Sequence, residues 1–387
     1  MSTFSKISEN LTGQKMFQIL AQAKDLEKQG KDVIHLEIGD PNFNTPQNVK
    51  DAACNAIQDN HTHYAISQGL EEFRRQAAKK ISHSRGFLPS VEQILVTPGA
   101  NIQIYLSLLA VADPGDEIII TDPCFVSYIS IINLCNLVPV KIALREENNF
   151  RLSPDDLKDA ITKKTKLIII NSPNNPTGSV INKNEMNAIY KIAEKNDIYI
   201  LSDEVYGRMV YEKGDFVSPS TFDHCNERVI VAHSLSKSYA MTGWRIGALM
   251  GPKELVRRMA LILETITSCV SPFIQMAAIE AMNGPQTETD EMIKKIRKSR
   301  DILVSGLNSI EGISCINPGG SFYAFPNVSG LKMSGVEFSN HLLRESFVAT
   351  CPGAYFGDAG KNNVRFCFAT SEIKIREAIE RMRLLFN

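Results

Sequence analysis

The residues KLIIINSPNNPTG (166–178) and IYILSDEVY (198–206) decide the expected fold of this 387-residue chain. Each begins with a short run of apolar residues rich in isoleucine, which is typical of a strand buried on both faces of a sheet. Each run then ends in polar and turn-forming residues. Between them, residues 183–196 have the spacing of apolar side chains that favours a helix. The order strand–helix–strand predicts two parallel strands whose C-terminal ends lie at the same edge of a sheet.

The same alternation continues on both sides of this unit. It predicts an α/β fold with a mostly parallel, seven-stranded sheet covered by helices. In such sheets ligands bind beyond the carboxyl ends of the strands, so polar motifs at those ends are candidate site residues. Further strands are expected at EQILVT (92–97), EIIIT (117–121), LVPVKIAL (137–144), RVIVAH (228–233) and IGALMG (246–251), and helices over 101–112, 125–134 and 154–161.

The pattern changes after about Pro285. A charged helix is expected over 288–309, and the mixed strands and helices that follow predict a smaller α+β domain at 286–387. Residues 46–285 are expected to form the large domain. Residues 1–45 are expected to form an N-terminal arm and part of the small domain, because VIHLEIG (33–39) precedes the alternating core.

Composition argues against several classes of protein. The formal net charge is −1 and no basic run stands out, so no electrostatic footprint for nucleic acid or an anionic membrane is expected. The N-terminus lacks an apolar secretory segment, and no apolar run is long enough to span a bilayer. Eight scattered cysteines are typical of free thiols in a reducing compartment, which predicts a cytoplasmic protein. His61 and His63 have a metal-like spacing, but no second cluster completes a metal site.

The strongest candidate for chemistry is HSLSKSYAMTGWR, residues 233–245. Lys237 follows an expected strand directly, with hydroxyl residues beside it and Arg245 eight positions later. A lysine that forms a Schiff base needs an accessible amine whose pKa is lowered by burial and positive charge. Serines and an arginine nearby can hold a phosphate. Taken alone, the motif would favour a solvated lysine beside a polar turn.

Three other strand ends carry polar residues. Asp203 can pair with a protonated pyridine nitrogen, although an aspartate after a strand is also a common helix N-cap. Asn175 offers an amide donor for a phenolate oxygen, although its neighbours also form a Pro/Gly turn. The backbone N–H groups of TPGAN (97–101), at the start of an expected helix, form a phosphate site, although many such turns contain glycine.

These motifs form an ordered series over nearly the whole chain. In this the chain resembles the class I and II aminotransferases, which are fold-type-I enzymes that use pyridoxal 5'-phosphate. The resemblance implies transfer of an amino group from an L-amino acid to a 2-oxo acid, with 2-oxoglutarate as the expected acceptor, by a ping-pong mechanism. It also implies a homodimer. The motifs are IGDPNFNTP (38–46), HYAISQGLEEFRR (63–75), TPGAN (97–101), DPCFVSY (122–128), NSPNNPTG (171–178), SDEVY (202–206), SLSKSYAMTGWR (234–245), PGGSFYAFP (318–326) and PGAYFG through VRFCFA (352–369).

The resemblance implies a role for each matching residue. Lys237 matches the Schiff-base lysine, Asp203 the partner of the pyridine nitrogen, and Tyr206 a contact to the phenolic oxygen. The positions implied for the substrate are Gly39, Asn175 and Arg365, of which the arginine holds the α-carboxylate. The positions implied for the cofactor are Gly99, Ala100, Asn101, Phe125, Asn175, Asp203, Tyr206, Ser234, Ser236, Lys237 and Arg245, with Tyr64 reaching the phosphate of the neighbouring subunit.

Two positions depart from the family pattern. Phe125 stands where the family usually has Tyr or Trp, so the ring that stacks on the pyridine is kept without its polar group. Asn101 stands where many bacterial aspartate enzymes have a lysine for the distal carboxylate, which favours a neutral or aromatic amino donor over aspartate. Two alternatives stay open: another reaction of these enzymes, such as β-elimination at a C–S bond, and a regulatory sensor that binds the cofactor.

Overall fold

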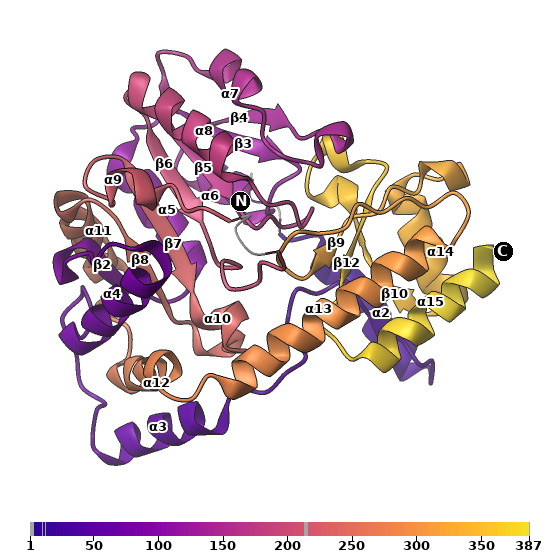
Figure 1. Ribbon diagram of the computed structural model, residues 1–387, viewed down its shortest axis with the longest axis horizontal. Coiled ribbons are helices and arrows are strands. Elements are labelled where there is room, and N and C mark those ends of the chain that lie inside the picture. Colours follow the sequence, from indigo (N-terminus) through magenta and orange to yellow (C-terminus); the bar gives the residue numbers. More distant parts are fainter. Residues whose placement is uncertain (1–3, 10, 12, 213–215, 387) are drawn as a thin grey trace.

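A computed structural model describes residues 4–9, 11, 13–212 and 216–386 (Figure 1). Its seven-stranded sheet has the order β2-β8-β7-β6-β5-β3-β4. The neighbours from β7 to β4 are parallel, whereas β8 is antiparallel to both β2 and β7. The prediction of a mostly parallel, seven-stranded α/β sheet is therefore confirmed. The strands are β2 (Ile94–Thr97), β3 (Glu117–Asp122), β4 (Val138–Ala143), β5 (Thr165–Asn171), β6 (Tyr199–Asp203), β7 (Val229–Ser234) and β8 (Gly247–Met250).

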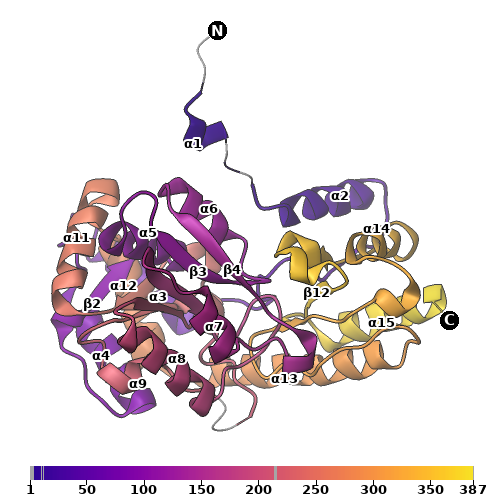
Figure 2. The ribbon, with the colours of Figure 1, turned by 90° about the horizontal axis from the view of Figure 1, so that it is seen from above.

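Both faces of the sheet are covered by helices, which explains the continuous apolar runs in the sequence. In β5, Leu167 and Ile169 pack into the core on one face, whereas Ile168 and Ile170 pack into the core on the other. Figure 2 shows the two helical layers. One layer has α5 (Ala100–Val111), α6 (Ser127–Leu134) and α11 (Lys253–Thr267); the other has α4 (Glu71–Arg85), α7 (Pro154–Ala160), α8 (Lys183–Lys195) and α9 (Ser220–Asp223).

The remaining elements include two smaller sheets. A parallel pair joins β1 (Ile34–His35) to β10 (Val348–Ala349), so the two ends of the chain meet in one sheet. An antiparallel sheet has the order β11-β12-β9. The elements are α1 (Lys6–Glu9), α2 (Met16–Lys28), α3 (Gln47–Gln58), α10 (Leu235–Ser238), α12 (Pro272–Asn283), α13 (Thr287–Asn308), α14 (Gly335–Ser346), α15 (Glu372–Phe386), β9 (Tyr323–Ala324), β11 (Cys351–Pro352) and β12 (Val364–Cys367).

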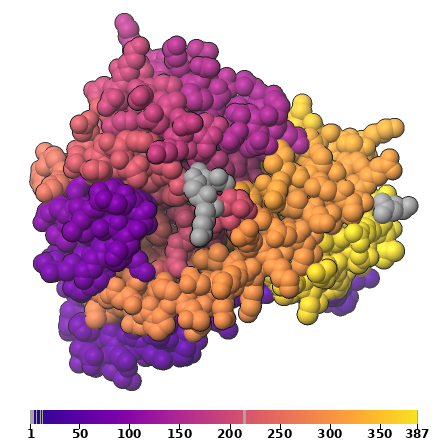
Figure 3. All heavy atoms as spheres, in the orientation of Figure 1, coloured from indigo at the N-terminus to yellow at the C-terminus, as the bar shows by residue number. Residues whose placement is uncertain are grey.

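The long helix α13 links the two parts of the molecule, and Figure 3 shows the orange and yellow C-terminal part packed beside the rest. The division at 1–45, 46–285 and 286–387 stays a prediction, and residues 1–3, 10, 12, 213–215 and 387 of it lie outside the described part. No helix in that part is long and apolar enough to cross a membrane.

Candidate active site

A cavity of about 320 Å³ opens at the C-terminal ends of β5, β6 and β7, beside the first turn of α5. In parallel α/β sheets, ligands bind at this edge, beyond the carboxyl ends of the strands. Residues of the N-terminal segment and of β12 complete its wall. The predicted residues that line the cavity are Gly39, Ala100, Asn101, Phe125, Asn175, Asp203, Tyr206, Ser234, Ser236, Lys237, Arg245 and Arg365.

Lys237 lies in the short helix that follows β7 directly. Its Nζ donates a hydrogen bond to the carbonyl oxygen of Gly39, at 2.5 Å. Burial lowers the pKa of this amine to about 8. No ion pair joins Lys237 to a carboxylate in the residues that the structure describes. The amine is therefore set up as a nucleophile rather than as half of a structural salt bridge.

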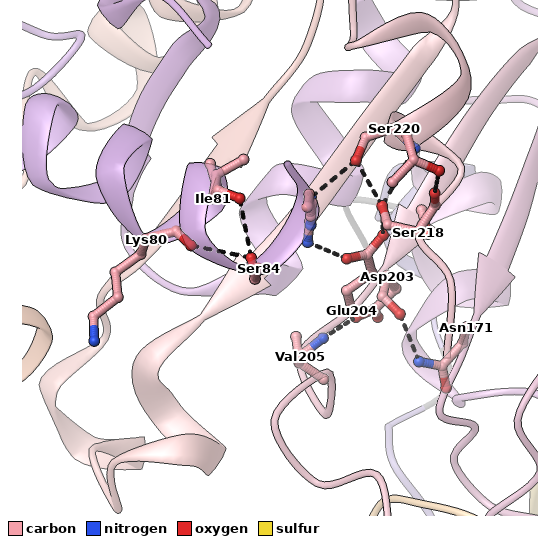
Figure 4. A network of polar contacts seen from close by, with 12 residues as sticks. Lys80, Ile81, Ser84, Asn171, Asp203, Glu204, Val205, Ser218 and Ser220 are labelled. Carbon is pink, nitrogen blue, oxygen red and sulfur yellow. Dashed lines mark hydrogen bonds and ion pairs between the residues drawn. The ribbon is translucent and has the colours of Figure 1, made fainter. Parts of the chain in front are cut away.

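Asp203 ends β6, and its side chain is buried, with only 4% of the residue exposed. Its Oδ2 accepts a hydrogen bond from the hydroxyl of Tyr128 at 2.6 Å. Its Oδ1 accepts one from the backbone N–H of Val205 at 3.2 Å (Figure 4). Burial raises the pKa of this carboxyl to about 6. A turn rather than a helix follows the strand, so the helix-cap interpretation of Asp203 is wrong. A cationic group in the cavity would relieve the unfavourable burial of this carboxylate.

Arg365, in β12, is almost fully buried. Its guanidinium lies between the rings of Tyr323 and Phe356, at 4.4 and 4.6 Å from their centroids. Nη1 donates to Oδ1 of Asn175 at 3.1 Å, and Nη2 donates to the carbonyl oxygen of Glu37. Within the described residues no carboxylate pairs with this cation, and its Nε has no partner. A planar, buried and unpaired guanidinium is suited to a bidentate carboxylate.

The opposite end of the cavity is suited to a phosphate. Helix α5 begins at Ala100, and Gly99 at its N-cap has a φ of +83°, a conformation that favours glycine. A Cβ at Gly99 would lie 2.4 Å from Nη2 of Arg245, so a side chain there would displace this guanidinium. Ser234 and Ser236 are buried and share a hydrogen bond of 2.8 Å between their hydroxyls. Backbone N–H groups, hydroxyls and a guanidinium together form a strong site for a phosphate.

Side chains to which the sequence assigned no role also belong to this cavity or support it, and three of them are Tyr128, Tyr323 and Asn171. Tyr128 holds Asp203, as described above. Tyr323 covers Arg365, and its hydroxyl contacts that of Tyr206 at 3.2 Å. Burial raises the pKa of the Tyr206 phenol well above its usual value, so it remains a hydrogen-bond donor. Asn171 also lines the cavity. All three lie inside quoted motifs (DPCFVSY, NSPNNPTG and PGGSFYAFP), which was the available signal.

Two predicted residues do not line the cavity. Gly99 is the N-cap of α5, next to the lining residue Ala100. Tyr64 is 89% exposed on the surface of the chain, so any contact it makes with a cofactor would be in another subunit. His61 and His63 are exposed as well, and the described residues contain no cluster suited to a metal ion.

The fold and the cavity together define an α/β enzyme built to hold pyridoxal phosphate. The buried carboxylate of Asp203, which has no cationic partner in the described residues, fits a protonated pyridine nitrogen. The cradle at Gly99 fits the phosphate, and the amine of Lys237 fits the aldehyde.

Comparison with known proteins then gives the family. The family described as "Aminotransferase class I and II" matches residues 31–382. The chain belongs to this family, and it is an enzyme that uses pyridoxal phosphate to move an amino group between amino acids and oxo acids.

Individual relatives agree over nearly their whole length. The chain is 39% identical over 370 residues to an aspartate aminotransferase of Pyrococcus horikoshii, covering 95% of this chain and 93% of the relative. The crystal structure of the aspartate aminotransferase from Rhizobium meliloti superposes with a TM-score of 0.94 at 33% identity, covering 99% of this chain and 98% of that one. An aromatic aminotransferase from Pyrococcus horikoshii superposes with a TM-score of 0.89 at 36% identity, covering 94% and 98%.

Proposed function

We propose that amino-group transfer in this enzyme depends on Lys237, Asp203 and Arg365. The observation that carries the proposal is their meeting in one cavity, each without an ionic partner among the described residues. When bound, pyridoxal phosphate supplies an aldehyde that takes the amino group and a ring that withdraws electrons. The names of the relatives favour this reaction over β-elimination at a C–S bond.

Each residue has a task that follows from its surroundings. Lys237, with its pKa lowered to about 8, would hold the cofactor covalently and, once displaced by the donor amine, would move the proton from Cα of the donor to the former aldehyde carbon of the cofactor. Asp203 keeps the pyridine nitrogen protonated from a buried position fixed by Tyr128. Arg365 orients the donor through its α-carboxylate. Asn175 and Tyr206 serve the phenolic oxygen, and Ser234, Ser236 and Arg245 serve the phosphate.

Borohydride reduction followed by peptide mapping tests the assignment of Lys237. The reduced cofactor label is expected on the peptide that contains residues 233–245, and the Lys237→Ala variant should carry no label and show no turnover. The Lys79→Ala variant is the control, because this lysine is exposed and does not line the cavity. A label on any lysine other than Lys237 would contradict the proposal.

For the amino donor we propose a neutral or aromatic amino acid in preference to aspartate, with 2-oxoglutarate as the acceptor. In the described residues the cations that line the cavity are Lys237, Arg245 and Arg365, and each already has a task. Apolar Met16, Phe17 and Ile38 line the same cavity, which suits an apolar side chain. The relatives named as aspartate aminotransferases are an argument for aspartate, and the one named as an aromatic aminotransferase is an argument for our choice.

The test compares kcat/KM for aspartate, alanine, methionine, phenylalanine and tyrosine, with 2-oxoglutarate as acceptor. The Asn101→Lys variant should shift the preference toward aspartate by roughly tenfold or more, because it adds a cation beside the cavity. Asn101→Gln, which adds length without charge, is the matched control. A wild-type preference for aspartate above about tenfold would contradict the inference.

We further propose a homodimer and a cytoplasmic location. The dimer is supported by Tyr64 and Ile66, which are 89% and 60% exposed although large and partly apolar. Tyr64 would then reach the phosphate bound by the partner. The division into an N-terminal arm, a large cofactor-binding domain and a small domain, at the boundaries given above, is part of the same proposal.

A further inference from the structure

A second cavity, of about 360 Å³, lies beside β7, the strand that precedes Lys237. Figure 3 shows the surface hollowed beside the purple atoms of α4. Alternate residues of β7 and the first turn after it serve the two cavities. Val231, His233 and Leu235 line the second cavity, whereas Ser234 and Ser236 line the first. A ligand in the second cavity would therefore touch the segment that positions Lys237.

The floor of the second cavity is apolar. Ile81 of α4, Ile94 of β2 and Met282 of α12 contribute to it, together with Val231 and Leu235. Their side chains come from helices on one face of the sheet and from the sheet itself. A cavity of this size with an apolar floor is suited to a small organic molecule.

The rim of the second cavity is cationic. Arg85 is neutralised by buried Glu204, and Arg208 pairs with Asp290 at 3.1 Å while lying over the ring of Tyr239. Lys80 is different: no hydrogen bond or ion pair of its Nζ occurs among the residues that the structure describes. Figure 4 shows its side chain extending away from the polar network around Glu204, Ser218 and Ser220.

Positive charge also acts on the titratable groups of this cavity. Burial and then the charge of Arg208 lower the pKa of Lys80, and the charge of Asp290 offsets part of this effect. Burial, with Arg85 and Arg208, lowers the pKa of His233 to about 4, so its imidazole is neutral at physiological pH. An anion placed beside Lys80 and Arg208 would remove this unfavourable crowding of positive charge.

We propose that the second cavity binds a small carboxylate that carries an apolar body. The carboxylate would pair with Lys80 and Arg208, and the body would cover Ile81, Ile94 and Met282. A neutral apolar molecule would leave the ammonium of Lys80 unpaired, and a small inorganic anion would leave the floor uncovered. The site is separate from the catalytic cavity, and the inference does not rest on the proposed roles of the catalytic residues.

The experiment uses 3-phenylpropanoate, which has no amino or oxo group to transfer, and the full chain with pyridoxal phosphate bound. Methionines labelled with ¹³C at the methyl group report on each cavity separately, because Met250 and Met282 line the second cavity and Met16 lines the first. We expect the Met250 and Met282 signals to shift and to saturate during the titration. If only Met16 responds, the ligand binds the catalytic cavity alone and the proposal is overturned.

Neighbouring lysines provide a matched pair of variants. Lys80→Met should weaken binding at Met282 by roughly tenfold, the usual effect of losing one charged hydrogen bond, whereas Lys79→Met, on the exposed side of α4, should change it less than about twofold. Ala248→Leu, which fills the cavity from β8, should abolish the shift while thermal unfolding and turnover confirm the fold. Equal binding of 3-phenylpropan-1-ol, or displacement by inorganic phosphate at equal concentration, would overturn the chemical class. Unchanged binding in Lys80→Met would overturn the site.

Discussion

Replacing Asp203 with asparagine should separate cofactor binding from catalysis. The amide has the size of the carboxylate, so the hydrogen bond from the N–H of Val205 to Oδ1 can be kept, and the hydroxyl of Tyr128 can turn to accept from the new NH₂. The phosphate cradle at Gly99 and Arg245 and the amine of Lys237 are not altered. We therefore expect the variant to fold and to retain the cofactor.

The magnitude follows from burial. Asp203 is only 4% exposed, and removing one member of a buried charge pair costs roughly 3–5 kcal/mol, since the remaining charge has no water to replace its partner. A neutral amide cannot stabilise a protonated pyridine nitrogen, so this loss falls on the step that removes the Cα proton. At about 1.4 kcal/mol for each factor of ten, the half-reaction should slow by roughly 10²- to 10⁴-fold.

The assay is stopped-flow absorbance of the bound cofactor during a single half-reaction with a saturating amino donor. Asp122→Asn is the matched control: Asp122 also ends a strand and is 7% exposed, but its carboxylate accepts from the N–H groups of Asp358 and Ala359, outside the cavity. The control should keep its half-reaction rate. An Asp203→Asn rate within about threefold of the wild type would mean that Asp203 acts only as a structural group.

Three other predictions concern pH, packing and assembly. In the protein without cofactor, the native state holds the proton of Asp203 more tightly than the unfolded chain, because its pKa is about 6 against a usual 3.8. Its contribution to the unfolding free energy, up to about 3 kcal/mol, is thus full below about pH 4 and is lost by about pH 6. In denaturant titrations, the difference in unfolding free energy between wild type and Asp203→Asn should therefore change by this amount between about pH 4 and about pH 6. A difference that stays constant over this range would refute the prediction. Gly39→Ala would place a methyl carbon 1.9 Å from the hydroxyl of Tyr323, so we expect that ring to shift off Arg365 and kcat/KM to fall roughly 10- to 100-fold, with cofactor absorbance unchanged. Sedimentation should show a dimer, and Tyr64→Phe should weaken cofactor affinity roughly tenfold or more; an active monomer would exclude this role.

The sheet could be predicted from the sequence because its inner strands, such as β5 and β6, are buried on both faces, whereas the edge strand β4 is largely exposed. Runs such as LIII (167–170) have no other common explanation between a turn and a helix. The direction of β8 could not be predicted in this way, since an apolar run such as GALM (247–250) is compatible with both parallel and antiparallel neighbours. The helix expected from Phe125 begins two residues later, at Ser127, after a turn that points the ring of Phe125 into the cavity.

The candidate site was partly predictable for a related reason. Lys237, Asp203 and Asn175 each lie at or shortly after the end of a strand, and parallel strands bring such residues together. Tyr128 and Tyr323 could not be assigned from their own surroundings in the sequence. Their hydroxyl partners lie 75 and 117 residues away, so only the folded chain shows that one supports Asp203 and the other contacts Tyr206.

Two consecutive acidic residues have different roles: one is paired within the protein, and the other is left without a cationic partner in the described residues. Asp203, the last residue of β6, and Glu204, directly after it, are both buried, but their side chains meet opposite helical layers: Asp203 contacts Tyr128 of α6 and Glu204 contacts Arg85 of α4. Glu204 meets Arg85 and accepts hydrogen bonds from the hydroxyls of Ser202 and Ser218, at 3.0 and 2.6 Å, so its charge is compensated within the protein. Asp203 has a phenol and one backbone N–H but no cation in the described residues, and burial raises its pKa accordingly. The sequence alone could not show which of the two adjacent acids, Asp203 or Glu204, is structural. The uncompensated one is the one left for a cationic ligand, and binding that ligand should stabilise the fold by restoring the balance that Glu204 already has.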